Sequence, residues 1–270
     1  MVQDFGAVSV AGLVDEITTM VERIFEALDS LRVKVERLYA ERATRGVLPS
    51  AADLGELRPD IVANLGAERG LVVGSGYISD VGALRDRDRW LEWWKSERDG
   101  RPARLVVSLD PDSDEFLDYT RQPWFTTPRS TDRRHITGPY VDYLCTDEYS
   151  LTLTAPVHHD GRFVGVVGSD VFVRGLELVL LPELRALAQQ AALVNAQGRV
   201  IVSNRARLAT GSLVREPDVA RLWPTRHDAP ERGPYSLKIG SPRPDGRAPE
   251  GCADELHLCA DLPLALLVSR

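Results

Sequence analysis

The chain has 270 residues, of which 43% are hydrophobic and 27% are charged, a composition typical of a globular protein with a buried core. Its formal net charge of -7 argues against a nucleic-acid surface, because phosphate binding needs clustered Lys and Arg. No apolar stretch approaches the roughly 20 residues that cross a bilayer, and the first residues lack the features of a secretory signal. We therefore expect a cytoplasmic protein without nucleic-acid or membrane partners.

The three cysteines are Cys145, Cys252 and Cys259, which agrees with a reducing compartment. Two of them flank His257 and could suggest a metal site. No CxxC pair accompanies them and the ligands are too few, so the pattern favours structural residues. We expect neither a metal nor a cofactor.

Residues 8–43 are predicted to form one long helix, about 50 Å in length. Apolar side chains recur at three- and four-residue steps along it, and charged residues fill the opposite face. These apolar residues are Val10, Leu13, Val14, Ile17, Met20, Val21, Ile24, Leu28, Leu31, Val35 and Leu38. Such a stripe needs a partner, which is its own domain, a second copy of the chain, or both. A homodimer through this helix is therefore one expectation.

A shorter helix is predicted over 50–65, followed by a buried strand over 71–78. Gly74-Ser75-Gly76 in this strand is only a fragment of the dinucleotide-binding fingerprint, and turn residues follow it instead of a helix. We therefore do not predict nucleotide binding. The aromatic segment 90–94 is interpreted as a strand or short helix that caps the core, and 103–109 as another strand.

The central segment has a predicted short helix at 116–128 and two strands, 149–157 and 163–171, joined by a hairpin turn at His159-Asp160-Gly161. A helix over 173–187 leaves the second strand. Further strands are predicted at 191–195, 200–204, 235–239, 255–260 and 263–268, with loops at 224–234 and 241–254.

Antiparallel hairpins beside helices indicate an α+β fold instead of a doubly wound parallel sheet. We predict a long N-terminal helix (1–48) as a possible dimer arm, a larger lobe (49–187) and a smaller second lobe (188–270).

The central segment resembles the Cache family of sensor domains. The resemblance rests on Tyr119 to Phe125 (Tyr-Thr-Arg-Gln-Pro-Trp-Phe), on 137–142, and on the hairpin 153–171. With the long leading helix, the order looks like the double Cache arrangement of two PAS-like lobes, here as a soluble, stand-alone member. Such domains usually stand between two membrane spans. A free copy would signal through a dimer or a partner such as a transcription regulator.

The resemblance implies a small-molecule site in the larger lobe, closed by Trp124 and Phe125 and lined by Tyr140, Asp142 and Asp170. Tyr77 and Tyr119 are further candidates. An aromatic wall with carboxylates suits a cationic amine, because the ring face attracts the cation and the carboxylates accept its N–H groups.

Amino-acid-binding members carry an arginine two residues before the tryptophan, where this chain has Gln122. Arg121 stands one step earlier and is also a candidate ligand contact. This departure favours an amine or an amino-acid-like metabolite over a standard α-amino acid.

Two other functions stay open. The chain could be a structural adaptor that dimerises through the first helix. It could also be a hydrolase-type enzyme or a metal site built on His158-His159-Asp160 with the nearby Ser150 and Ser169. Adjacent histidines on a strand face opposite ways, however, and no catalytic motif accompanies them. We expect a non-enzymatic sensor, with the ligand, the partner and any role of the second lobe unspecified.

Overall fold

The computed structural model describes residues 8–142, 148–223, 235–239 and 254–269. The predicted loop at 224–234, most of the one at 241–254, Cys145 and Cys252 lie outside the described residues. The chain divides into two compact units. Unit 1 comprises Met1–Val21, Gly138–Val141 and Val173–Arg270, and unit 2 comprises Glu22–Thr137 and Asp142–Phe172.

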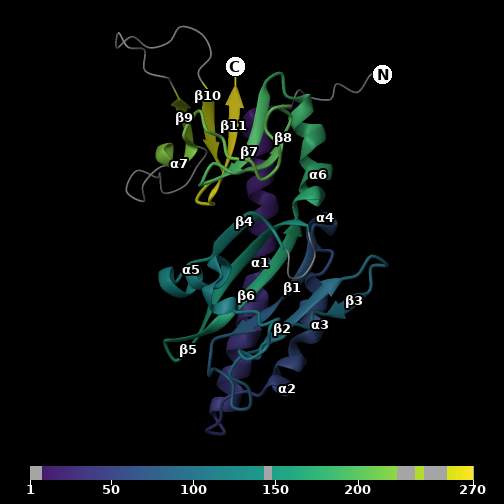
Figure 1. The fold of residues 1–270 in the computed structure, drawn as a ribbon, viewed down its shortest axis with the longest axis vertical. Coiled ribbons are helices and arrows are strands. Elements are labelled where there is room, and N and C mark those ends of the chain that lie inside the picture. The colour runs from purple at the N-terminus through teal and green to yellow at the C-terminus, as the bar shows by residue number, and fades with distance from the viewer. Residues whose placement is uncertain (1–7, 143–147, 224–234, 240–253, 270) are drawn as a thin grey trace. The chain divides into compact units, whose positions relative to one another are not determined.

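The predicted long helix is confirmed as α1 (Val10–Ala43) (Figure 1). Its apolar stripe is buried within a single chain: Ile17 and Ile24, for example, are 1% and 3% exposed. Val33 is the large apolar residue of α1 that stays exposed among those described. A second copy is therefore not needed to cover the stripe, which removes the main reason for expecting a dimer through it.

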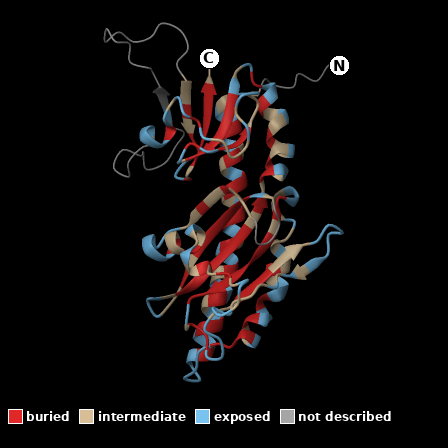
Figure 2. Ribbon diagram, in the orientation of Figure 1, coloured by how far each residue is buried: buried red, intermediate tan, exposed pale blue. Residues whose placement is uncertain are grey.

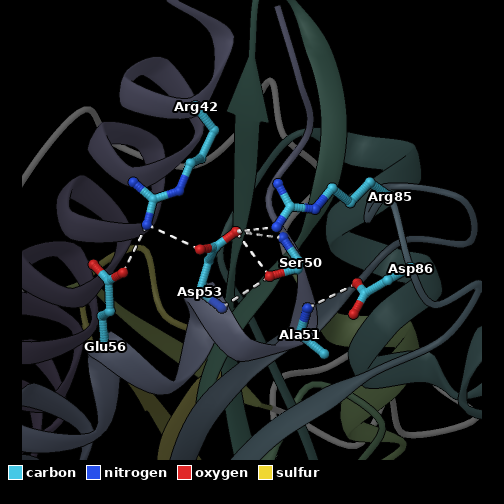
Figure 3. Close-up of polar contacts among 7 residues, drawn as sticks. All are labelled: Arg42, Ser50, Ala51, Asp53, Glu56, Arg85 and Asp86. Atoms are coloured by element: carbon cyan, nitrogen blue, oxygen red, sulfur yellow. Dashed lines mark hydrogen bonds and ion pairs between the residues drawn. The ribbon is translucent and has the colours of Figure 1, made fainter. Parts of the chain in front are cut away.

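A polar network joins the end of α1 to the start of α2 (Ala51–Leu54), and Figure 3 shows its side chains. Arg42 donates to Asp53 at 3.0 Å and to Glu56 at 2.6 Å. Asp53 also completes a capping box with Ser50, which satisfies free backbone N–H groups at the helix start. The hydrogen bond from Arg42 holds the pKa of Asp53 well below its usual range, so this carboxylate stays charged.

Sheet A has six strands in the order β3-β2-β1-β6-β5-β4, and all of it except Gly138–Val141 of β4 belongs to unit 2. Its strands are β1 (Val72–Ser79), β2 (Leu91–Ser96), β3 (Pro102–Arg104), β4 (His135–Val141), β5 (Tyr149–His159) and β6 (Arg162–Phe172). The short helices are η1 (Gly55–Leu57), α3 (Arg58–Asn64), α4 (Ala67–Gly70), η2 (Tyr119–Arg121) and α5 (Pro123–Thr131). The pairs β1–β2, β1–β6, β2–β3 and β5–β6 are antiparallel.

The two faces of sheet A pack against different helices, because successive side chains of a strand point to opposite faces. Tyr77 of β1 faces α1, where its hydroxyl lies 3.0 Å from that of Tyr39. Its neighbour Ile78 faces the other way and clusters with Tyr119 of η2 and Phe125 of α5. We call this second side of the sheet the α5 face.

Unit 1 contains α6 (Val173–Ala186), α7 (Val219–Leu222) and the five-stranded antiparallel sheet C, with order β8-β7-β11-β10-β9. Its strands are β7 (Gln190–Asn195), β8 (Val200–Ser203), β9 (Tyr235–Ile239), β10 (Asp254–Leu258) and β11 (Leu264–Ser269). Figure 2 shows that β1, β5 and β6 of sheet A and β7 and β11 of sheet C are buried over most of their length. The expected α+β class with two antiparallel sheets is confirmed.

Two local predictions need correction. The strand predicted at 103–109 is confined to β3, because the chain leaves the sheet after Arg104 and Val106 is 84% exposed. Leu105, Val107 and Leu109 still pack on the core without extending that strand, which explains their apolar pattern. The helix predicted at 116–128 is split into η2 and α5, since Pro123 starts a new helix after the extended Gln122.

Candidate functional site

Three glycines in neighbouring strands leave room on the α5 face for the indole of Trp93. In the register of sheet A, Gly76 of β1 lies opposite both Trp93 of β2 and Gly168 of β6. A Cβ at Gly74, Gly76 or Gly168 would lie 3.0 to 3.1 Å from an atom of the Trp93 ring. The indole therefore lies across the glycines, a close approach that side chains would prevent.

Asp170 of β6 lies on the α5 face beside Gly74. It lies opposite Gly74 on β1 and opposite Thr152 on β5. The Thr152 hydroxyl donates to Asp170 Oδ1 at 2.7 Å. Asp170 Oδ2 and the indole Nε1 of Trp93 lie 3.1 and 3.0 Å from the position that a Cβ of Gly74 would take. A carboxylate oxygen and an N–H donor thus converge beside one glycine.

Neither of these two atoms has a hydrogen-bond partner among the residues that the structure describes. Trp93 is 4% exposed, and its N–H group has no acceptor among the described residues. The buried hydroxyl of Thr154, two residues from Thr152 on β5, is also unpaired within the described chain. Because buried polar groups are normally hydrogen-bonded, these groups mark a place where a ligand can bind.

Burial raises the pKa of Asp170 to about 7. The hydrogen bond from Thr152 acts in the opposite direction, and the nearby carboxylate of Asp142 raises the pKa further. Part of Asp170 remains accessible to solvent although protein surrounds the carboxylate closely. At neutral pH this group is therefore divided between its neutral and charged forms, and an approaching cation would favour the charged form.

The aromatic candidates occupy the apolar end of the α5 face. Phe125 is fully buried, with edge-on ring contacts to Tyr119, Trp124 and Phe163 at centroid distances of 5.2, 6.3 and 5.6 Å. Tyr119 is also fully buried and donates to the carbonyl of Ser79 at 2.8 Å. Trp124 is half-buried against the cluster that contains Trp93. Tyr119 and Phe125 are thus core residues, whereas Trp124 keeps an accessible surface.

Tyr77 and Arg121 are not brought together with Asp170, and the position of Tyr140 relative to Asp170 stays untested. Tyr77 is fully buried on the α1 side of the sheet, and its hydroxyl donates to the carbonyl of Val164 at 2.5 Å. Arg121 is 86% exposed and pairs with Asp118 at 3.0 Å. Tyr140 lies half-buried on β4, in the part of that strand that belongs to unit 1.

Sequence reasoning missed Trp93, Thr152 and the glycines. Trp93 was interpreted as a cap of the core, and Gly74-Ser75-Gly76 as a broken nucleotide motif. Glycine at alternate positions of an apolar strand was a usable signal, since it marks a flat surface that another group approaches. Thr152 gave no such signal, because threonine is common in strands.

The histidines of β5 and the described cysteine do not form a metal centre in the described residues. His158 and His159 face opposite sides of β5, with ring contacts to Phe163 and Tyr39 respectively, each at 5.8 Å. Cys259 is buried, and burial raises the pKa of its thiol to about 12, so it stays protonated. No cluster of three metal-ligating side chains occurs in the portion of the chain described.

Residues 105–177 match a family model described as methyl-accepting chemotaxis protein-like, first PDC sensor domain. Among solved structures, methyl-accepting chemotaxis protein X has a TM-score of 0.62 at 15% identity, covering 96% of this chain and 92% of its own. The ligand-binding domain of the Pseudomonas aeruginosa amino acid chemoreceptor PctC, in complex with GABA, has a TM-score of 0.52 at 18% identity, with 95% and 93% coverage. The ligand-binding domain of the Pseudomonas fluorescens chemoreceptor CtaA, in complex with L-valine, has a TM-score of 0.53 at 17% identity. The match covers 97% of this chain and 92% of that domain.

These likenesses confirm the resemblance to Cache-type (PDC) sensor domains, and the fold is that of such domains. None of the curated proteins matches this sequence. None of the helices in the described ranges has the length and apolar character to span a bilayer.

Proposed function

We propose that unit 2 binds a small metabolite with a protonated amino group, either an amine or an amino acid, and passes this event to a partner protein. The observation that carries the proposal is Asp170, whose Oδ2 is unpaired within the described residues and lies beside the unpaired N–H group of a buried indole. A ligand ammonium would replace the proton on this carboxylate and form a charge-assisted hydrogen bond.

The surroundings of Asp170 suit such a ligand. The second carboxylate, Asp142, adds negative charge, and Trp93 offers a ring that attracts cations. GABA and L-valine, with which the PctC and CtaA domains form complexes, also carry amino groups, which supports this choice of ligand.

The proposal is tested by thermal shift with ethanolamine, GABA and L-valine, using the whole chain. A ligand at a hundredfold excess over its Kd stabilises the folded state by about 2.7 kcal/mol, so the melting temperature should rise with at least one of them. Asp170→Asn should abolish the shift, since it keeps the shape but removes the charge.

Asp132→Asn provides the matched control, because Asp132 is an exposed carboxylate of the same unit. This variant should respond like the wild type. A wild-type melting temperature that none of the three ligands changes, or an equal response from Asp170→Asn, would contradict the proposal.

A further inference from the structure

A basic residue lies on the other side of Gly74 from Asp170. Lys95 of β2 lies opposite Gly74 in the antiparallel pair, and Asp170 of β6 lies opposite the same glycine on its other side. Residues directly opposite in such pairs share a face of the sheet. Lys95 and Asp170 therefore flank Gly74. Because they are two strand spacings apart, their Cα atoms are separated by about 10 Å.

Gly74 places no side chain between this base and acid. The indole Nε1 of Trp93, which is two residues from Lys95 on the same strand, and Oδ2 of Asp170 lie 3.0 and 3.1 Å from the position that a Cβ of Gly74 would take. The ammonium of Lys95 and the N–H group of Trp93 are thus donors on the β2 side of Gly74, and the carboxylate of Asp170 is an acceptor on the β6 side. A zwitterion whose carboxylate faces β2 and whose ammonium faces β6 matches this order of charges.

The partner of Lys95 in the structure is replaceable. Its Nζ lies 3.4 Å from Oε1 of Glu97, and the two side chains are 33% and 47% exposed. Exposed pairs of this kind contribute little net stability, so a ligand carboxylate can compete with Glu97. Arg121, by contrast, pairs with Asp118 in solvent and is not brought to Asp170.

We propose that Lys95 and the indole N–H of Trp93 bind the carboxylate of an amino acid while Asp170 binds its ammonium group. Lys95 then supplies the basic contact to the ligand carboxylate that Arg121, paired with Asp118 in solvent, does not supply. The inference rests on the proposed function and narrows its ligand from any amine to an amino acid.

The experiment compares two pairs of ligands that differ in the carboxylate: GABA with n-butylamine, and L-valine with isobutylamine. Affinities are measured by calorimetric titration of the wild type, Lys95→Met, Trp93→Phe and Lys34→Met. Lys34 is the matched control, since it is also a half-exposed lysine paired with a carboxylate, that of Asp60 on α3.

In the wild type, the amino acid of at least one pair should bind at least about tenfold more tightly than its amine. Lys95→Met should bring this ratio close to one without weakening the amine. Trp93→Phe keeps an aromatic ring without the N–H group, and it should lower the ratio about three- to tenfold. Lys34→Met should leave the ratio unchanged.

Amines that bind the wild type as tightly as the amino acids, or a ratio that Lys95→Met does not change, would overturn this inference and leave the amine site intact. Binding of none of the four ligands would overturn the proposed function as well. The two failures are therefore distinguishable.

Discussion

Sheets A and C are both antiparallel, but the side chains at the centre of one face differ in chemistry between the two sheets. In sheet C the buried cluster is wholly aliphatic and includes Val194, Leu256 and Leu267. The centre of the α5 face of sheet A instead contains glycines, an indole with an unpaired N–H group and the titratable Asp170. The aliphatic cluster stabilises unit 1, whereas the face in unit 2 retains costly polar groups, which is expected of a binding site.

The largest expected effect lies in unit 1. Leu267→Ala removes a fully buried side chain from the aliphatic cluster and should lower the free energy of unfolding by about 2–5 kcal/mol, measured by urea denaturation. The affinity of the folded protein for its ligand should stay within about twofold of the wild type. A large loss of affinity with little loss of stability would reverse the roles assigned to the two units.

The next largest effect is expected on the pH dependence of stability at Asp170. Because its pKa in the folded protein, about 7, lies above the unfolded value of 3.8, its stabilising protonation is complete at low pH and is lost as the pH rises through 7. Asp170→Asn cannot ionise, so it should gain stability over the wild type between pH 4 and pH 8, on the order of 1–2 kcal/mol. Thermal melts of both proteins at the two pH values measure this gain, and a loss at pH 8 would indicate a structural role for the charge.

A similar effect is expected on binding. An ammonium ligand requires the charged form of Asp170, so affinity should increase about tenfold from pH 6 to pH 8 and level off above that. Titrations with GABA at half-unit intervals give the profile. A flat profile over this range would mean that the ligand does not contact this carboxylate.

The smallest expected effect is at Arg121. Since its side chain is 86% exposed and pairs with Asp118, Arg121→Ala should change ligand affinity by less than about twofold. Calorimetric titration with GABA tests this. A tenfold loss would show that Arg121 turns inward when the ligand binds, and would place the carboxylate contact there instead of at Lys95.

Much of the fold could be predicted because its signals are local. The three- and four-residue steps of α1 and the alternation of β5 and β6 are visible in short windows of sequence. Asp170 was predictable for a similar reason, since a charge in an apolar strand is conspicuous.

The rest of the site depends on strand register, which a single sequence does not specify. Lys95, Gly74 and Asp170 are far apart along the chain, and the pairing of β2, β1 and β6 alone places them in one row. Arg121, in contrast, was chosen by its spacing to Trp124, but the extended Gln122 between η2 and α5 leaves it in solvent. A location in the cytoplasm, a dimer through α1 and a transcription regulator as partner stay predictions.

The central claim is that a ligand ammonium displaces the proton of Asp170. Titration of the protein with GABA at pH 7, in two buffers of different ionisation enthalpy, counts the protons released on binding. With a pKa of about 7 in the free protein, the account predicts a release of about half a proton per ligand, decreasing toward zero at pH 9. Binding at pH 7 without proton release, or with proton uptake, would contradict it.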